Sequence, residues 1–377
     1  MKRFVITVTM VAIAACWGSL SCAQGLADQP IVDQVSLEST GSSALVLAPD
    51  PGESQPSVLQ ASQPSGGTAS CQGCASPCGD CLDCRCDPMW VVRGDAIFLR
   101  RSTPSAAVLV TDSFIPGGNV LLDASQFNFD TRAGWDIYLA RNRLFGPWGI
   151  EASFFSVEGW NAVVDPVLSP GGAVVQFAVP LGNVFFPANV SGSYASRLYN
   201  VEINARRPLN DWLTLLAGFR YVDLSEQGLT ITQDIGPGVN TGVYSINARN
   251  YMPGFQLGLE GLIPVTRRLS LGATGKAGIL SNQASNDVNI TQTIGPSFAC
   301  AAAQTHAAFV GQLDFAAQYS VAKNLNIRAG YQLLWLDGVA TAVQQVGVSD
   351  PANEVGGINT GNGVFYNGAF VGLEYRR

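Results

Sequence analysis

The chain has 377 residues and a mass of 39.7 kDa, only 13% of its residues are charged, and its formal net charge is -7 at pH 7. The 41 glycines and a mean hydropathy of +0.19 are typical of a β-barrel that faces lipid and atypical of a soluble enzyme. Lys and Arg do not gather in a basic patch, which argues against a nucleic-acid partner. No apolar run after the N-terminus reaches the ~18 residues that a spanning helix needs, so a membrane form would cross as strands.

Residues 1–23 are typical of a secretory signal peptide. Lys2 and Arg3 precede an apolar stretch, and the small residues 21–23 offer a cleavage site. An alternative interpretation is a lipoprotein signal, because residues 13–16 resemble a lipobox that ends in Cys16. Both interpretations predict export, with the outer membrane as the destination.

Residues 24–88 are rich in Ser, Pro, Gly, Gln and Ala and contain no aromatic residue. Such a segment cannot bury enough apolar surface to offset the entropy of ordering, which predicts a disordered periplasmic tether. Its repeated Cys-x2-Cys spacing fits disulfides, within the segment or to a neighbouring chain, or a metal or redox site built from thiolates. Because export argues against reduced thiols, we expect disulfides. The candidates are Cys71, Cys74, Cys78, Cys81, Cys84 and Cys86.

From Trp90 onward, apolar and polar residues alternate with a period of two, which predicts strands with one apolar and one polar face. Ten such strands occur, and an even number returns both ends of a barrel to the same rim. The predicted strands are 90–101, 127–141, 148–158, 195–207, 212–223, 254–263, 268–280, 306–320, 325–336 and 364–376.

The connections between these strands alternate between short and long. Tight turns are predicted at 143–147, 208–211, 264–267 and 321–324, and long loops at 103–126, 159–194, 224–253, 281–305 and 337–363. Short turns on one rim and long loops on the other are typical of outer-membrane barrels. We therefore predict an all-β fold for residues 89–377: a single antiparallel up-and-down transmembrane β-barrel of about ten strands, with long extracellular loops.

Two of the long loops share a motif. The sequence of residues 231–237 recurs, with one change, as residues 290–296. We expect the two copies to be extracellular extensions of strands that pair with each other. A duplicated binding site is the alternative.

One face of strands 212–223, 306–320 and 325–336 is predicted to meet lipid, because its odd-numbered residues are apolar or aromatic over 213–221, 309–319 and 325–335. Trp90 and Trp148 at the turn rim, and Trp160 and Trp335 near the loop rim, fit the aromatic belts of a membrane interface. The alternative is that these aromatic residues fill a soluble core.

The opposite face collects charges that are predicted to line the lumen. A barrel of about ten strands is narrow, so these charges should pair, and any conductance should be small and weakly ion-selective. The proposed lumen-lining residues are Arg93, Asp95, Arg132, Asp136, Glu151, Glu202, Arg206, Arg220, Glu260, Lys276, Asp314, Arg328 and Glu374, and Arg101, Asp130 and Arg376 were assigned to the same face.

Residues 90–99, with the pattern Trp-x-x-Arg-x-Asp before an aromatic-aliphatic run, resemble the opening strand of the planctomycete outer-membrane β-barrel porin family. The resemblance extends through residues 134–141 and 372–375. It implies an outer-membrane barrel over about residues 89–377. The chain departs from many such barrels at its end, where Tyr375-Arg376-Arg377 replaces the terminal Phe or Trp that the insertion machinery reads.

Three functions fit these observations: a narrow porin for small solutes, a non-conducting structural or anchoring barrel, and a soluble exported barrel that binds a small apolar ligand. The expected partners are outer-membrane lipid and, through the tether, other envelope proteins. We expect no enzyme, because the single histidine, His306, has no evident nucleophile system, although Asp314 follows on the same face. Cys300 is expected to be free or paired with another Cys, and neither a metal nor a cofactor site is expected in the barrel.

Overall fold

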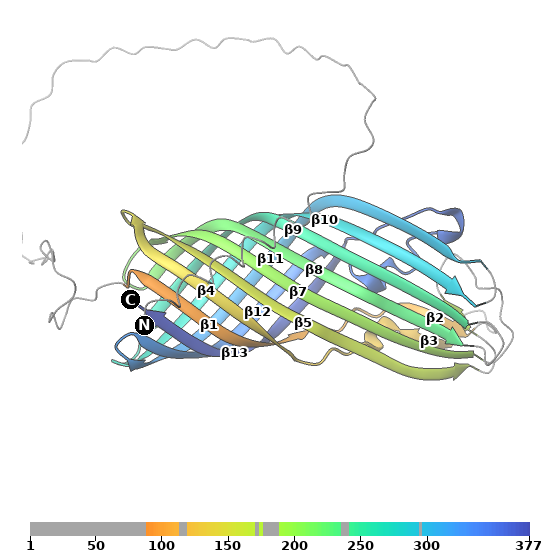
Figure 1. The fold of residues 1–377 in the computed structure, drawn as a ribbon, viewed down its shortest axis with the longest axis horizontal. Helices are drawn as coiled ribbons and strands as arrows, with labels where there is room; N and C mark the ends of the chain where they lie inside the picture. Colours follow the sequence, from red (N-terminus) through yellow and green to blue (C-terminus); the bar gives the residue numbers. More distant parts are fainter. Residues whose placement is uncertain (1–87, 113–118, 170–172, 176–187, 235–240, 294–295) are drawn as a thin grey trace, which may run out of the picture. The chain divides into compact units, whose positions relative to one another are not determined.

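The computed structural model describes residues 88–112, 119–169, 173–175, 188–234, 241–293 and 296–377 (Figure 1). The predicted signal peptide and six-Cys segment lie in residues 1–87, outside the described residues. Ten antiparallel strands close into a barrel, which confirms the predicted fold class. In order around the barrel they are β1 (Trp90–Arg101), β13 (Asn362–Arg376), β12 (Leu325–Val339), β11 (Phe298–Ala322), β10 (Leu269–Gln292), β9 (Thr241–Pro264), β8 (Leu213–Asp234), β7 (Ala188–Pro208), β5 (Trp148–Ser169) and β4 (Arg132–Phe145).

Three segments between barrel strands, β1–β4, β5–β7 and β12–β13, carry short elements of their own. Strands β2 (Val108–Asp112), β3 (Val120–Asp123) and β6 (Ala173–Val175) form a small sheet in the order β3-β2-β6. Helical turns η1 (Ala124–Gln126), η2 (Ala342–Gln345) and η3 (Pro351–Asn353) are of the 3-10 type. No helix among the described residues is long and apolar enough to cross a bilayer.

The tight turns lie at one rim of the barrel, where the two ends of its chain also meet (Figure 1). Phe145 pairs with Trp148 across the β4–β5 turn, and Leu209 N donates to Leu213 O across the β7–β8 turn. Trp90 N donates to Arg377 O at 2.7 Å, which joins the first and last strands. Residues before Trp90 therefore leave the barrel from the turn rim.

Most barrel strands extend further from the turn rim than the sequence pattern predicted. Strands β5 and β7 to β11 have 21 to 25 residues, whereas β1, β4, β12 and β13 have 12 to 15. Much of the predicted loops 224–253 and 281–305 is thus strand. The predicted strand 127–141 is also wrong at its start, because β4 begins at Arg132. Asp130 precedes β4 and is exposed, so it does not belong to the inward set.

The side-chain pattern of β10 reverses its polarity half-way along the strand. In the turn-side half, Leu271 and Ile279 face outward and are 49% and 71% exposed, while Lys276 lies on the inner face. In the far half the outward positions become polar and the inward ones mostly apolar, without a shift in parity. The outward set there is Ser281, Gln283, Ser285, Asp287 and Asn289, and the inward apolar set is Leu280, Ala284, Val288 and Ile290.

Three strands pass the same boundary through a bulge at a glycine. Gly159, Gly228 and Gly338 have φ values of 76°, 74° and 74°, a left-handed conformation that favours Gly, and each sits at a register shift. A bulge moves the following residues to the other face of the strand. Trp160 therefore points inward and is fully buried, which corrects its prediction as an interface aromatic. Trp90 and Trp148, at 39% and 37% exposure, do face outward.

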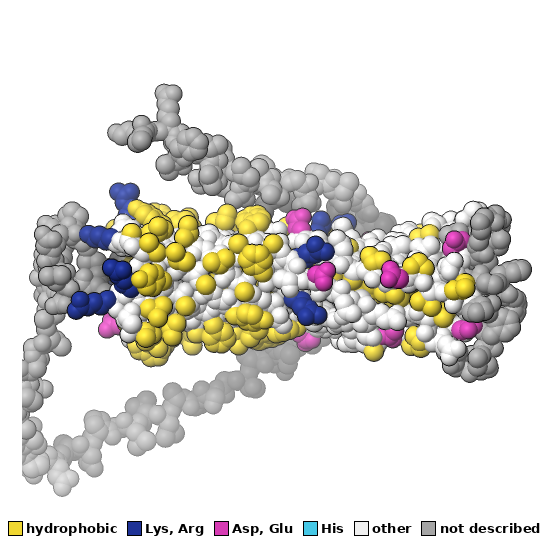
Figure 2. All heavy atoms as spheres, turned by 90° about the horizontal axis from the view of Figure 1, so that it is seen from below, with side chains coloured by type: hydrophobic (Ala, Val, Ile, Leu, Met, Phe, Trp, Pro, Cys, Tyr) yellow, Lys and Arg dark blue, Asp and Glu magenta, His cyan; other side chains and the backbone are white. Residues whose placement is uncertain are grey.

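The outer surface divides into the same two parts (Figure 2). Hydrophobic side chains cover the turn-side half between charged side chains at the turn rim and a second group of Lys, Arg, Asp and Glu where that cover ends. The outward apolar residues run from Phe255 of β9 to Val265 in the turn that follows it, which for a tilted strand corresponds to a band about 25 Å tall. We name this band the apolar belt and the part of the barrel beyond it the outer half.

Candidate functional site

The interior of the barrel at the level of the apolar belt is filled with charged side chains. Nine of the sequence-predicted lumen residues surround a cavity of only ≈ 70 Å³. A cavity of that size holds a few water molecules and no larger solute. The nine residues are Arg93, Asp95, Asp136, Glu151, Glu202, Glu260, Lys276, Asp314 and Arg328.

Carboxylates shared between several donors hold this group together. Glu260 of β9 pairs at 3.2 Å with Arg93 of β1, on the opposite side of the closed sheet, and at 2.8 Å with Arg206 of β7, two strands away. Arg93 Nε also donates to Glu374 at 2.6 Å, and Glu374 accepts from Arg376 as well. The ion pairs thus tie β1, β7, β9 and β13 together across the lumen.

A second set of bonds centres on Glu202 of β7. Its carboxylate accepts from Lys276 Nζ at 2.7 Å and from Gln256 Nε2 at 2.7 Å, and Arg220 Nη1 lies 3.6 Å away. Beside it, Glu151 accepts from the Tyr138 hydroxyl at 2.8 Å. We call these residues together the charge lattice.

The other five predicted lumen residues take a smaller part in the lattice or none. Arg328 pairs with Asp95 at 2.8 Å, and Asp314 accepts from Gln312 Nε2 at 2.8 Å. Asp136 lies against the cavity. Among the described residues no ion pair includes Asp136 or Arg132, and the Nε atom of Arg132 has no hydrogen-bond partner.

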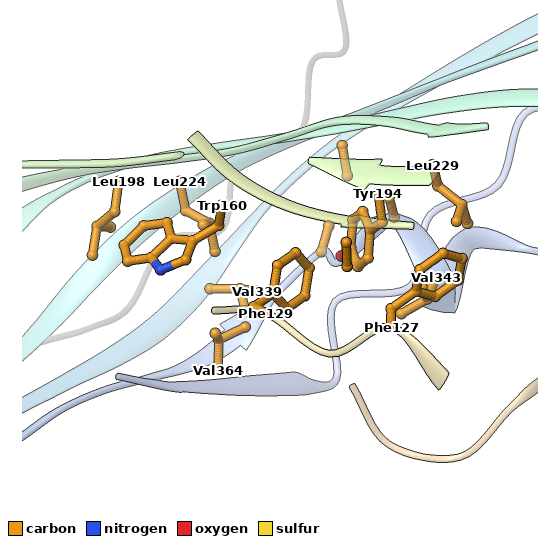
Figure 3. Close-up of a cluster of buried hydrophobic side chains, with 14 of the residues drawn as sticks. Phe127, Phe129, Trp160, Tyr194, Leu198, Leu224, Leu229, Val339, Val343 and Val364 are labelled. Carbon is orange, nitrogen blue, oxygen red and sulfur yellow. The ribbon is translucent and has the colours of Figure 1, made fainter. Parts of the chain in front are cut away.

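The outer half of the interior is mostly apolar, and it is filled by residues of the β1–β4 and β12–β13 segments. Figure 3 shows Phe127 and Phe129, which follow η1, and Val343 of η2 packed among side chains from the long strands. The Tyr194 ring lies 5.7 Å from that of Phe127 and 5.2 Å from that of Phe129. We call this cluster the plug. Its labelled members are Phe127, Phe129, Trp160, Tyr194, Leu198, Leu224, Leu229, Val339, Val343 and Val364.

A buried carboxylate fastens the plug to the wall. Glu226 accepts hydrogen bonds from Tyr194, from Arg101 and from the backbone N of Ala342, the last at 2.9 Å. Tyr194 lies beyond the apolar belt, and burial raises the pKa of its hydroxyl well above the ordinary value, an effect that outweighs the opposing charge of Arg101. The hydroxyl therefore stays protonated and donates to Glu226. Asn250 adds two bonds to Ala340, at 2.7 and 2.8 Å.

Sequence reasoning missed the plug because much of it lies in predicted loops, and because Phe127 and Phe129 were placed at the start of the predicted strand 127–141. A signal was present in the apolar residues Phe127, Phe129 and Val343, which a solvated loop has no reason to carry. The reversal of polarity along β10 was a second signal. The lattice thus fills the interior around the ≈ 70 Å³ cavity at the level of the belt, and the plug fills it in the outer half.

The repeated loop motif does not pair as predicted. Ile231 of β8 and Ile290 of β10 both lie opposite Tyr244 of β9, one on each side of that strand. The two copies therefore flank β9 and do not touch each other through backbone pairing. Residues 235–237 and 294–295 of the motif lie outside the described residues.

His306 and Cys300 lie on β11 in the outer half. His306 Nε2 is 2.7 Å from Gly338 O, so one ring nitrogen is engaged with the backbone. Asp314 is eight residues further along the strand, inside the belt, and is too distant to assist it. Cys300 is a free thiol. Within the part of the chain that the structure describes, no group of His, Cys, Asp and Glu could hold a metal ion.

Comparison with known proteins supports the fold alone. No protein-family model and no curated protein matches the chain, so the planctomycete porin resemblance has no support beyond the barrel itself. Solved structures that match include the outer membrane protease OmpT from Escherichia coli, at 13% identity and a TM-score of 0.42, covering 76% of this chain and 96% of that one.

Two further matches have other roles. The Ralstonia pickettii toluene transporter TbuX is 11% identical, with a TM-score of 0.29, and the match covers 76% of this chain and 88% of that one. The translocator domain of autotransporter NalP from Neisseria meningitidis is 12% identical, with a TM-score of 0.34 and coverage of 78% and 91%.

Proposed function

We propose that the protein spans the bacterial outer membrane as a closed, non-conducting barrel that anchors its N-terminal segment to the envelope. The filled interior carries this proposal. Passage of a solute would require breaking the shared ion pairs of Glu260 and Glu202 and also displacing the plug from Glu226 and Asn250. A narrow porin would need a continuous polar path, and the plug offers none.

The apolar belt supports the membrane location. Large apolar side chains such as Phe255, Leu257 and Ile279 are more than half exposed, and water would disfavour so many of them side by side. Acyl chains of lipid would contact these side chains without that cost. A closed sheet can lie in lipid because its backbone groups are already paired with each other. A soluble barrel that binds an apolar ligand would instead place such residues inside.

The position of the chain ends supports the anchoring role. The first described barrel strand begins at the turn rim, which faces the periplasm in outer-membrane barrels. Residues 24–88 would then emerge into the periplasm, where their six Cys can form disulfides. The proposal includes no catalysis, because His306 is engaged with a backbone carbonyl.

Single-channel recording in planar bilayers tests closure. The purified barrel should show no conductance steps. A variant in which Glu260 and Arg206 become Ala and residues 341–345 become Gly and Ser should begin to conduct, since it removes the ion pairs of Glu260 and the segment of the plug that is bound to Glu226. Discrete, reproducible steps from the unmodified protein would contradict closure and favour the porin.

The anchoring role is tested separately with the six Cys. Their joint replacement by Ser should remove reductant-sensitive bands on non-reducing gels. The heat-modifiable migration of the folded barrel should not change. If the bands and the envelope association are the same in both proteins, the segment does not anchor anything through disulfides.

A further inference from the structure

A larger cavity lies at the outer edge of the belt, where the short wall of β12 and β13 ends. Its volume is ≈ 480 Å³, within the range of roughly 300–1,000 Å³ that is usual for small-ligand sites. The last pair between these strands is Asn362 with Val339, after the bulge at Gly338. Residues 102–105 line the cavity on one side and residues 341–344 on the other. It is separate from the charge lattice and lies beside the plug.

One side of the cavity is aromatic and faces the membrane. Phe309, Trp335 and Phe365 line it from the outward faces of β11, β12 and β13. The Trp335 ring lies across Gly311, where a Cβ atom would come within 2.0 Å of the ring, and 6.3 Å from the ring of Phe309. The next outward residue on β12 is Asp337, so the aromatic residues mark the end of the belt. This level corresponds to the head groups of the outer leaflet.

Two other lining residues, Arg101 and Asn362, carry buried donor atoms without partners. The Arg101 side chain is 2% exposed, and its Nε and Nη1 atoms have no hydrogen-bond partner. The amide Nδ2 of Asn362 is likewise buried and without a partner. Buried donors of this kind are costly unless an acceptor oxygen reaches them.

The charges favour a neutral acceptor over an anion. Arg101 is already balanced by its ion pair with Glu226. Asp337 lines the same cavity and would repel a carboxylate or phosphate, but it can accept from a hydroxyl group. The complementary ligand has ester or hydroxyl oxygens at one end and an alkyl chain at the other.

We propose that this cavity binds a neutral single-chain glycerolipid, with its alkyl chain against Trp335 and its ester and hydroxyl oxygens at Arg101, Asn362 and Asp337. The ligand enters from the outer leaflet and does not cross the barrel. The proposal rests on the membrane location proposed above and is independent of whether the lumen conducts.

Photo-crosslinking tests the site in the full-length protein reconstituted in lipid nanodiscs. The probe is a monoacylglycerol with a diazirine in its alkyl chain, and labelled peptides are mapped by mass spectrometry. We expect labelling of residues 335–344 and 362–365 well above that of the belt residues 255–265. Unlabelled monolaurin should compete at the cavity, and dodecane should not, because it lacks the oxygens.

Three substitutions separate binding in the cavity from general lipid contact. Ser105→Trp fills the cavity and should reduce its labelling severalfold, whereas Ala106→Trp, on the exposed neighbour that does not line it, should not. Asn362→Ala should raise the monolaurin concentration needed for competition about fivefold, for the loss of one hydrogen bond. Heat-modifiable migration verifies that each variant is folded.

The outcomes distinguish this proposal from the one on which it rests. Belt labelling without enrichment at the cavity, or enrichment that survives Ser105→Trp, overturns the lipid site and leaves the membrane location intact. Stronger competition by laurate than by monolaurin overturns the neutral head group. Absence of labelling on residues 255–265 overturns the membrane location and the lipid site with it.

Discussion

Glu226 shows how a single side chain couples the plug to the wall. It is fully buried and accepts from three donors on three different elements, β1, β7 and the turn that begins η2. Nothing in the sequence separates Glu226 from other acids of β8, because its partners lie far away along the chain. Its role follows only from closure of the barrel, which brings Arg101 beside it.

Substitution Glu226→Gln should therefore destabilise the protein strongly. The guanidinium of Arg101 would remain buried without a counter-charge, a loss that typically costs about 3–5 kcal/mol. Unfolding in urea, followed by the gel migration of folded and unfolded forms, measures it. Glu158→Gln is the control, since Glu158 is exposed on the outer wall and bonds only Tyr199 there, and it should change stability by less than ~1 kcal/mol. Equal effects of the two substitutions would contradict the role assigned to Glu226.

The strands show what could and could not be predicted at the scale of elements. The period of two identified ten strands and their tight turns correctly, because alternation directly reflects which face is buried. The predicted strands were too short. The predicted strand 268–280 stopped at Leu280, whereas β10 continues to Gln292 with the polarity of its two faces exchanged. Bulges such as that at Gly159 then reversed the face of Trp160, and a parity argument cannot see a bulge.

Two substitutions on β10 test the boundary between its halves. Ala273→Arg places a charge in the belt and should cost about 2–4 kcal/mol, as charges do near the middle of the membrane on a barrel surface. Gln283→Arg, ten residues further on the same outward face, should cost nearly nothing because that position is in water. Unfolding from lipid vesicles measures both. A soluble barrel would tolerate both substitutions equally.

A matched pair of valines tests the plug. Val343 of η2 is 2% exposed and packs in the plug, whereas Val348, five residues later, is 38% exposed. Val343→Ala should destabilise the outer half by about 2 kcal/mol through the cavity that it leaves. Val348→Ala should have an effect below ~0.5 kcal/mol. Hydrogen exchange of residues 340–350 reports the difference, and similar exchange in the two variants would mean that the plug does not hold this segment.

On the scale of the whole molecule, one closed sheet serves two solvents. In the belt the wall is apolar outside and charged inside, and in the outer half it is polar outside and apolar inside. The first half follows the rule for a membrane barrel and the second the rule for a soluble protein. The alternation of residues in the belt was enough to predict the fold class and the charged lumen-lining residues. The plug and the lipid cavity belong to the outer half, where long-range contacts between loops and strands decide the structure.

The reversal of environment along β10 can be measured directly. In a protein whose six tether Cys and Cys300 are replaced by Ser, spin labels are placed in turn at the outward positions 271, 273, 277, 279, 281, 283 and 285. Their collisions with oxygen, which concentrates in lipid, and with a water-soluble nickel complex are compared in bilayers. We expect collisions with oxygen to be the more frequent through position 279, and collisions with the nickel complex to be the more frequent from position 281 onward. Equal access of the nickel complex to all seven positions would contradict it.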